Sequence, residues 1–186
     1  MERKGFTIVE LVVAIMIVGV ALAITLPRFR ASPAQKVKAA ATQLVRELEM
    51  ARTRGLAAKR SARLVFNVTG NSYVGYEDYN GNGLFYENAT EMEALRWPGV
   101  SQLSPDVRFG RGNATTSAPG DTTASGAVTF INGRLTFGKD GLTTPFGTRG
   151  AVYFVSSTSA DVVAAVSVTG AGSFKVWLYQ GGGAWR

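Results

Sequence analysis

Glu10 is the residue with the most distinctive chemistry in this sequence, because it is an acid inside an apolar run. Phe6–Leu26 holds 21 residues, and Glu10 is the only charged one among them. An unpaired carboxylate at bilayer depth costs roughly 3 kcal/mol, so a chain that keeps one there is expected to supply a partner for it. Gly5 stands directly before the run, after the basic residues Arg3 and Lys4.

A second group of oxygen-bearing side chains begins at Asp78. Asp78, Asn80 and Asn82, with Gly83 in sixth position, follow the first half of an EF-hand calcium loop. That loop requires a bidentate glutamate in twelfth position, which here is Ala89. Asp, Asn and Gly also favour tight turns, and we favour a turn over a metal site here.

The composition excludes several kinds of catalytic site. The chain has no histidine and no cysteine. Disulfides, thiolate metal sites and Ser-His or Cys-His nucleophiles are therefore absent. We expect no cofactor and no enzymatic activity. An anchored enzyme that relies on carboxylates is the least favoured alternative.

The positive charge is concentrated at the N-terminal end of the sequence. Residues 1–63 hold 12 basic and 4 acidic residues, whereas residues 64–186 hold 8 and 9. The C-terminal two thirds are close to neutral, which argues against nucleic-acid binding despite the net charge of +7. If DNA were bound, Lys175 and Arg186 would be the candidate contacts.

The apolar run predicts a membrane-spanning helix. Twenty-one residues at 1.5 Å each reach about 31 Å, which matches a bilayer core. Arg3 and Lys4 favour a cytoplasmic N-terminus, whereas Arg28 and Arg30 oppose it. Pro27 is expected to interrupt the helix. Gly19 is either a second weak point or a site of close helix packing, and the sequence leaves both open.

Helical periodicity resumes over residues 33–63. One apolar stripe recurs at spacings of three, four and seven residues: Leu44, Leu48, Ala51, Ala58 and Ala62. Arg52, Lys59 and Arg63 fall on a neighbouring face, where we expect a solvated basic flank.

From Leu64 the hydrophobic period changes to two, which predicts strands over residues 64–68, 72–77, 127–131, 134–138, 151–156, 162–169 and 174–179. Asn132-Gly133 predicts a type I′ hairpin between two of them. Residues 113–126 are rich in Ser, Thr and Gly and predict a mobile loop. The expected fold class is α+β, a long N-terminal helix packed on an antiparallel sheet.

The segment Gly5-Phe6-Thr7-Ile8-Val9-Glu10-Leu11, followed by the apolar run, resembles the leader of type IV pilins and type II secretion pseudopilins. The resemblance implies that a prepilin peptidase cuts after Gly5 and that Phe6 is then methylated. It also implies that Glu10 supports assembly, and that a free N-terminal amine of a neighbouring subunit neutralises it.

The rest of the chain is most similar to the GspH/FimT branch of minor pseudopilins and minor pilins. The resemblance lies in residues 44–66, 78–83, 134–144, 147–154 and 165–177. Some FimT-like pilins have a Gly-Arg-x-Arg segment linked to DNA binding. The aligned residues here are Gly172-Ser173-Phe174-Lys175, which lack both arginines.

The resemblance implies four parts: a leader (residues 1–5), a transmembrane and filament-core helix (6–27), its amphipathic continuation (28–63) and a β-rich head (64–186). It implies an inner-membrane protein with a periplasmic head. The expected partners are other pilins or pseudopilins, the prepilin peptidase/N-methyltransferase and the membrane. The function expected is structural, in a type II secretion pseudopilus or a type IV pilus. A DNA-capturing minor pilin is the alternative.

Overall fold

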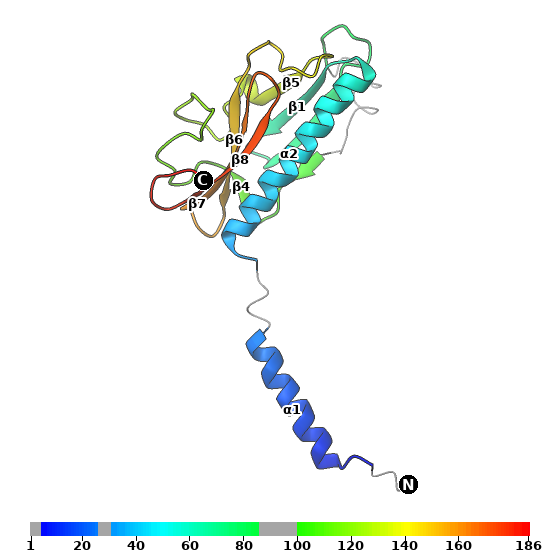
Figure 1. Cartoon of the computed structure of the whole chain (residues 1–186), viewed down its shortest axis with the longest axis vertical. Coiled ribbons are helices and arrows are strands. Elements are labelled where there is room, and N and C mark those ends of the chain that lie inside the picture. The colour runs from blue at the N-terminus through cyan, green and yellow to red at the C-terminus, as the bar shows by residue number, and fades with distance from the viewer. Residues whose placement is uncertain (1–4, 26–30, 86–99) are drawn as a thin grey trace. The chain divides into compact units, whose positions relative to one another are not determined.

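The computed structural model describes residues 5–25, 31–85 and 100–186. By its internal contacts the chain divides into two units, Met1–Ser32 and Pro33–Arg186. The first unit contains helix α1 (Ile8–Thr25) and the second contains helix α2 (Pro33–Ala58) with all the strands (Figure 1). Helices and antiparallel sheets confirm the predicted α+β class.

Among the described residues, eight strands follow α2: β1 (Ala62–Asn67), β2 (Ser72–Glu77), β3 (Val100–Gln102), β4 (Val107–Phe109), β5 (Arg134–Phe137), β6 (Gly150–Ser156), β7 (Val162–Val168) and β8 (Phe174–Gln180). They form two antiparallel four-stranded sheets, in the orders β3-β2-β1-β5 and β4-β6-β7-β8. The sequence predicted six of these strands within two residues at each end. It did not predict β3 and β4, each of which has only three residues.

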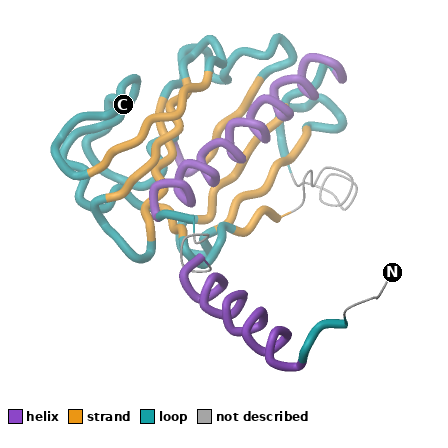
Figure 2. The backbone as a smooth tube through the Cα atoms, turned by 60° about the horizontal axis from the view of Figure 1, so that its bottom comes forward, coloured by secondary structure: helices purple, strands orange, loops and turns teal. Residues whose placement is uncertain are grey.

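Helix α2 packs against β1 of the first sheet and against β6, β7 and β8 of the second, as Figure 2 shows. The buried residues of α2 lie mostly three or four positions apart, which places them on one face of the helix: Val37, Ala41, Leu44, Glu47, Leu48, Ala51 and Gly55. At Gly55 a Cβ would lie 3.1 Å from the Arg60 carbonyl oxygen and 3.3 Å from that of Gly138, so only glycine fits without a shift. This stripe is what joins the two sheets into one core.

The helix predicted to extend to Arg63 ends at Ala58. Lys59 has a left-handed φ of 53°, and the Arg60 amide donates to the Gly55 carbonyl at 3.1 Å. This is a Schellman-type end, with lysine where glycine is usual. The predicted stripe member Ala62 is therefore buried from β1, and Ala58 is exposed.

We predicted that three basic side chains near the end of this helix are solvated, and this prediction is wrong for two of them. Arg52 donates to the carbonyl oxygens of Gly141 at 3.0 Å and Gly172 at 3.2 Å. Arg63 donates from Nε to Thr136 Oγ1 at 2.8 Å. Lys59 is exposed, as expected.

The predicted hairpin at Asn132-Gly133 does not form. Both residues have the positive φ that the dipeptide predicted, 55° and 61°. However, Ile131–Gly133 form a short 3-10 turn, and the segment before it makes only an isolated bridge, Val128 to Val152 of β6. Strand β5, after the turn, pairs with β1. The turn therefore connects the two sheets, and the strand predicted over 127–131 is wrong.

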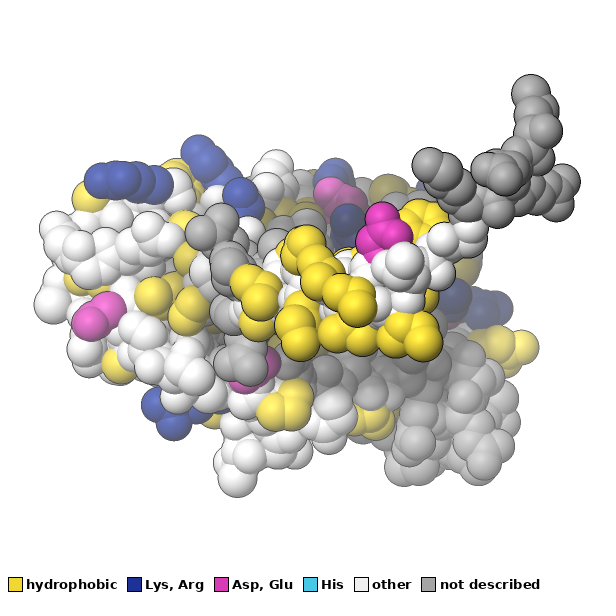
Figure 3. Space-filling model, turned by 90° about the horizontal axis from the view of Figure 1, so that it is seen from below, with side chains coloured by type: hydrophobic (Ala, Val, Ile, Leu, Met, Phe, Trp, Pro, Cys, Tyr) yellow, Lys and Arg dark blue, Asp and Glu magenta, His cyan; other side chains and the backbone are white. Residues whose placement is uncertain are grey.

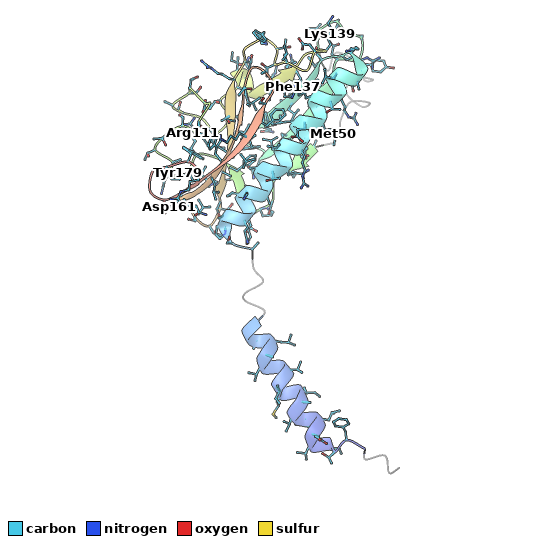
Figure 4. All side chains as sticks on the ribbon, viewed as in Figure 1. Met50, Arg111, Phe137, Lys139, Asp161 and Tyr179 are labelled. Carbon is cyan, nitrogen blue, oxygen red and sulfur yellow. The ribbon has the colours of Figure 1, made fainter. Side chains whose placement is uncertain are left out.

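The segment 113–126 is irregular, as predicted, but Arg111 binds it along its length. The Arg111 guanidinium donates to Asp121 Oδ2 at 2.7 Å and to the carbonyl oxygens of Thr123, Ala124 and Gly126 at 2.6–3.2 Å. It also lies 4.1 Å from the centroid of the Tyr153 ring. Figure 4 labels Arg111 on the side of this unit away from α2.

Tyr153 and Asp121 complete this polar network. The Tyr153 hydroxyl donates to Asp121 Oδ2 at 2.6 Å and accepts from the Ala118 amide at 2.9 Å. Burial, and then the hydrogen bond to Asp121, raise the pKa of Tyr153 to about 12. The Asp121 side chain is 0% exposed, so its charge is fully desolvated and depends on Arg111.

Candidate functional site

The N-terminal segment positions Glu10 in the first turn of α1. Thr7 precedes the helix, and its hydroxyl oxygen accepts the Glu10 amide at 3.3 Å. Glu10 Oε2 in turn accepts the Thr7 amide at 3.4 Å and the Thr7 hydroxyl at 3.5 Å. This reciprocal arrangement is a capping box. A carboxylate in the first turn also interacts favourably with the helix dipole.

The capping bonds are long, and the carboxylate is exposed. Charge-assisted N–H···O hydrogen bonds usually measure about 2.7–2.9 Å. Glu10 is therefore held in place without being tightly bound. A stronger donor, such as an ammonium group, can replace these contacts at little energetic cost.

The residues around Glu10 are apolar and exposed. Phe6 is 85% exposed, and Figure 3 shows a group of hydrophobic side chains beside an acidic one. The apolar side chains of α1 face outward on all sides of the helix: Ile8, Val9, Leu11, Val12, Val13, Ile15, Met16, Ile17, Val18, Val20 and Leu22. Within residues 5–25, 31–85 and 100–186, no helix combines the length and apolar character needed to cross a membrane.

Neither predicted glycine of this segment is constrained by the fold. A Cβ added at Gly5 or Gly19 would meet no atom within 4 Å. Helix α1 continues through Gly19 without a break. Any requirement for glycine at position 5 must therefore come from a partner. Pro27, the other predicted weak point, lies outside the described residues.

Comparison with known proteins identifies the N-terminal segment. Residues 1–26 match the family model described as the prokaryotic N-terminal methylation motif. The N-terminal segment carries a prokaryotic methylation motif. No curated protein matches the chain.

Two solved structures are similar to part of the chain. One is the minor pseudopilin EpsH from the Type 2 Secretion System of Vibrio cholerae, with 10% identity, a TM-score of 0.49, and coverage of 76% of this chain and 95% of that one. The other is the type IV minor pilin FimU of Pseudomonas aeruginosa, with 15% identity, a TM-score of 0.47, and coverage of 75% and 87%.

Outside the methylation motif, Asp78 organises the loop that follows β2. Asp78 is 2% exposed, and its Oδ1 accepts the amides of Gly81 and Asn82 at 2.8 and 3.1 Å. Its Oδ2 accepts the Gly83 amide at 2.8 Å. Asn80 and Asn82 each accept the amide two residues ahead. Both Asp78 oxygens thus face the loop's own backbone. Ala89 and the acids beside it lie outside the described residues.

We expect no tight calcium binding at this loop, because a cation would compete with three backbone N–H groups for the Asp78 carboxylate. A ligand that binds only the folded chain raises the melting temperature. The measurement is a thermal scan with and without millimolar calcium. A rise of several degrees that disappears in Asp78→Ala, but not in the exposed-acid control Asp161→Ala, would establish a calcium site. Within the described parts of the chain, no three acidic side chains gather.

The two DNA candidates, Lys175 and Arg186, do not form a basic patch with each other. Lys175 is exposed, with Nζ 4.0 Å from the centroid of the Trp177 ring. Arg186 exchanges both backbone hydrogen bonds with Leu178, at 2.8 and 3.0 Å. Three residues of extended strand, about 10 Å, separate Lys175 from Leu178.

Sequence reasoning missed two residues that the structure brings into view. Thr7 was not singled out, although Thr-x-x-Glu before an apolar run is the signature of a capping box. Glu47 on α2 is buried beside Tyr73 and accepts from Gln43 at 2.8 Å and from Ser101 at 3.3 Å. Burial and the Glu47 charge raise the pKa of Tyr73 above its usual range. No local pattern marks that acid as buried.

Proposed function

We propose that this protein is a structural subunit of a secretion pseudopilus or a pilus. The finer assignment is a minor pseudopilin of a type II secretion system, or the equivalent minor pilin of a type IV pilus, in the GspH/FimT branch. The observation that supports this most is the methylation motif over residues 1–26, which coincides with Gly5, Phe6 and Glu10. A structural role also suits a chain without histidine or cysteine.

The proposed assembly step depends on a new amine. Cleavage of the peptide bond after Gly5 frees the amine of Phe6, which is then methylated. In the filament, this cationic amine of one subunit pairs with Glu10 of its neighbour. Glu10 can leave its contacts with Thr7 for that pair, because those contacts measure 3.4 and 3.5 Å, whereas a hydrogen bond between an ammonium and a carboxylate measures about 2.7–2.9 Å.

The proposed location is the bacterial inner membrane, with the first unit as the anchor. Support comes from the sequence, since Phe6–Leu26 holds 21 residues and a single charge. Residues 6–27 would first span the membrane and later form the filament core, with Gly19 and Pro27 as weak points. The unit Pro33–Arg186 would lie in the periplasm. The proposed partners are other subunits, the prepilin peptidase/N-methyltransferase and the membrane.

We do not propose nucleic acid as a partner. Residues 64–186 hold 8 basic and 9 acidic residues, and backbone binding to DNA needs several phosphate contacts. The candidates Lys175 and Arg186 supply at most two positive charges, and they are separated along β8.

Leader removal tests the proposed function. With the cognate peptidase, the wild-type chain is expected to lose residues 1–5, and Gly5→Val is expected to retain them almost completely. The physical reason is that Gly5 has no steric role in the chain itself, so the added side chain acts only on the peptidase. Mass spectrometry of the mature N-terminus measures both.

Gly19→Val is the matched control, because it introduces the same side chain at another unconstrained glycine. It is expected to be cleaved as wild type is. Retention of residues 1–5 by the wild-type chain would sink the proposed function, and a plain membrane anchor would replace it.

A further inference from the structure

A hollow of about 250 Å³ lies along the outer face of the first sheet, beside β5. Its lining includes Arg63 of β1 and Arg134 and Thr136 of β5. Asn132, Thr144 and Thr148 contribute from the flanking turns. Figure 4 labels Phe137 and Lys139, which mark the end of β5 and the turn after it.

The strand register brings the two arginines to the same face. Arg63 pairs with Thr136, and Arg134 pairs with Val65, so Arg63 and Arg134 are diagonal neighbours across β1 and β5. Diagonal residues of adjacent antiparallel strands lie about 7–8 Å apart, within reach of long side chains. Two like charges at this distance repel, and an anion between them would remove that repulsion.

Both guanidinium groups keep donors available. Arg63 uses Nε for Thr136 Oγ1 and lies 3.9 Å from the centroid of the Phe85 ring, which fixes the plane of its fork. Its two terminal nitrogens make no hydrogen bond to the described residues, and the Arg134 guanidinium makes neither a hydrogen bond nor an ion pair with them. By contrast, Arg111 has five hydrogen-bond acceptors and Arg52 has two.

The remaining lining supplies more donors and no negative charge. None of the described residues that line the hollow is acidic. The hydroxyl groups of Thr136 and Thr144 and the amide of Asn132 can donate hydrogen bonds to a ligand. The Thr148 hydroxyl already donates to the Pro145 carbonyl at 2.6 Å. Ile131, which also lines it, is 77% exposed, and Phe146, next to the lining residue Pro145, is 81% exposed. The hollow therefore combines two cations with neutral donors, within an apolar rim.

We propose that this hollow binds a phosphate group, held by Arg63 and Arg134 with hydroxyl donors from Thr136 and Thr144. A planar guanidinium fork matches the oxygens of phosphate in pairs, which is why arginine is preferred where such groups are recognised. At about 30 Å³ of liquid volume per water, the hollow has room for a group of this size. This site is independent of the N-terminal segment, so it stands whether or not the proposed assembly function does.

Calorimetric titration of the full chain in detergent with inorganic phosphate, at low ionic strength, tests the site. Wild type is expected to bind one phosphate, and Arg134→Gln is expected to weaken binding at least about tenfold, as loss of a charged hydrogen bond does. Arg134 is exposed, so this change should not unfold the chain. The matched control is Arg108→Gln, which removes an exposed arginine from β4 and should leave the affinity within about twofold.

A second ligand distinguishes a lipid headgroup from the free ion as the source of the phosphate group. Glycerol phosphate, the soluble equivalent of a lipid headgroup, binding more tightly than inorganic phosphate would support the site and point to a headgroup. Equal binding would support a site for the free ion. Absence of saturable phosphate binding, or equal affinity in Arg134→Gln, would overturn the proposal. So would binding of a short single-stranded oligonucleotide that Arg108→Gln and Arg134→Gln weaken alike, because that is a diffuse charge effect.

Discussion

Glu10→Gln is expected to be cleaved and membrane-inserted normally, and to enter filaments at least about tenfold less well than wild type. Glutamine keeps the length and the hydrogen-bonding oxygen of Glu10, so the contacts with Thr7 can persist. It removes the charge that is proposed to pair with the amine of a neighbouring Phe6. Breaking a buried pair costs about 3–5 kcal/mol, since the remaining charge stays buried without a partner. Incorporation is measured by shearing and crosslinking.

Comparison of Glu10→Val with Glu10→Gln separates the effect of the charge from that of the hydrogen bonds. Glu10→Val removes both, so if the charge decides assembly, its incorporation into filaments should fall to the same extent as that of Glu10→Gln. Thr7→Val is the matched control, because it removes the capping hydroxyl and leaves the carboxylate, and it should lose only the roughly 1 kcal/mol of a helix cap. Normal incorporation of Glu10→Gln would refute the pairing with an amine while leaving leader removal, and therefore the methylation motif, untouched.

Local patterns predicted the parts of the fold that depend on neighbouring residues. The apolar stripe from Leu44 to Ala51 is buried at the expected spacing, because helix geometry alone sets which residues share a face. Alternation likewise predicted β6, β7 and β8. The N-terminal methylation motif was also predictable, since residues 1–26 form one continuous stretch of sequence that needs no tertiary contact.

The parts that the sequence did not predict depend on distant residues. Asn132 and Gly133 adopt the expected positive φ, but the choice between a hairpin and a turn linking two sheets depends on pairing with β1 and β6. Strands β3 and β4 are too short to show alternation. Helix α2 ends with Lys59 in a conformation that usually calls for glycine, so its end carried no sequence signal.

Arg111 is the clearest example of a residue whose role only the structure reveals. Its partners Ser117, Asp121, Thr123, Ala124 and Gly126 lie in a segment whose composition is typical of a loose loop. One guanidinium with five acceptors changes that expectation. The composition of a segment indicates only its own conformational preferences. Here the conformation of residues 113–126 depends on hydrogen bonds from one side chain outside the segment.

Arg111→Met is expected to destabilise the unit Pro33–Arg186 by about 3–5 kcal/mol, because the Asp121 side chain, which is 0% exposed, would lose its cationic partner. For a chain of this size, that corresponds to a fall of roughly 6–20 °C in melting temperature. Three carbonyl groups of the 113–126 segment would also lose their donor. Thermal unfolding followed by circular dichroism measures the change.

The double variant Arg111→Met/Asp121→Asn distinguishes an unpaired charge from lost packing. Tyr153 and Thr129 now donate to different oxygens of Asp121. Asparagine keeps one acceptor oxygen for one of these two donors, and it leaves no buried charge without a partner. If the buried charge causes most of the loss, the double variant should be more stable than Arg111→Met alone. Arg108→Gln, at an exposed arginine, should stay within about 0.5 kcal/mol of wild type. A double variant no more stable than Arg111→Met would instead assign the effect to the carbonyl contacts and to stacking on Tyr153, because those are the interactions that both variants lose.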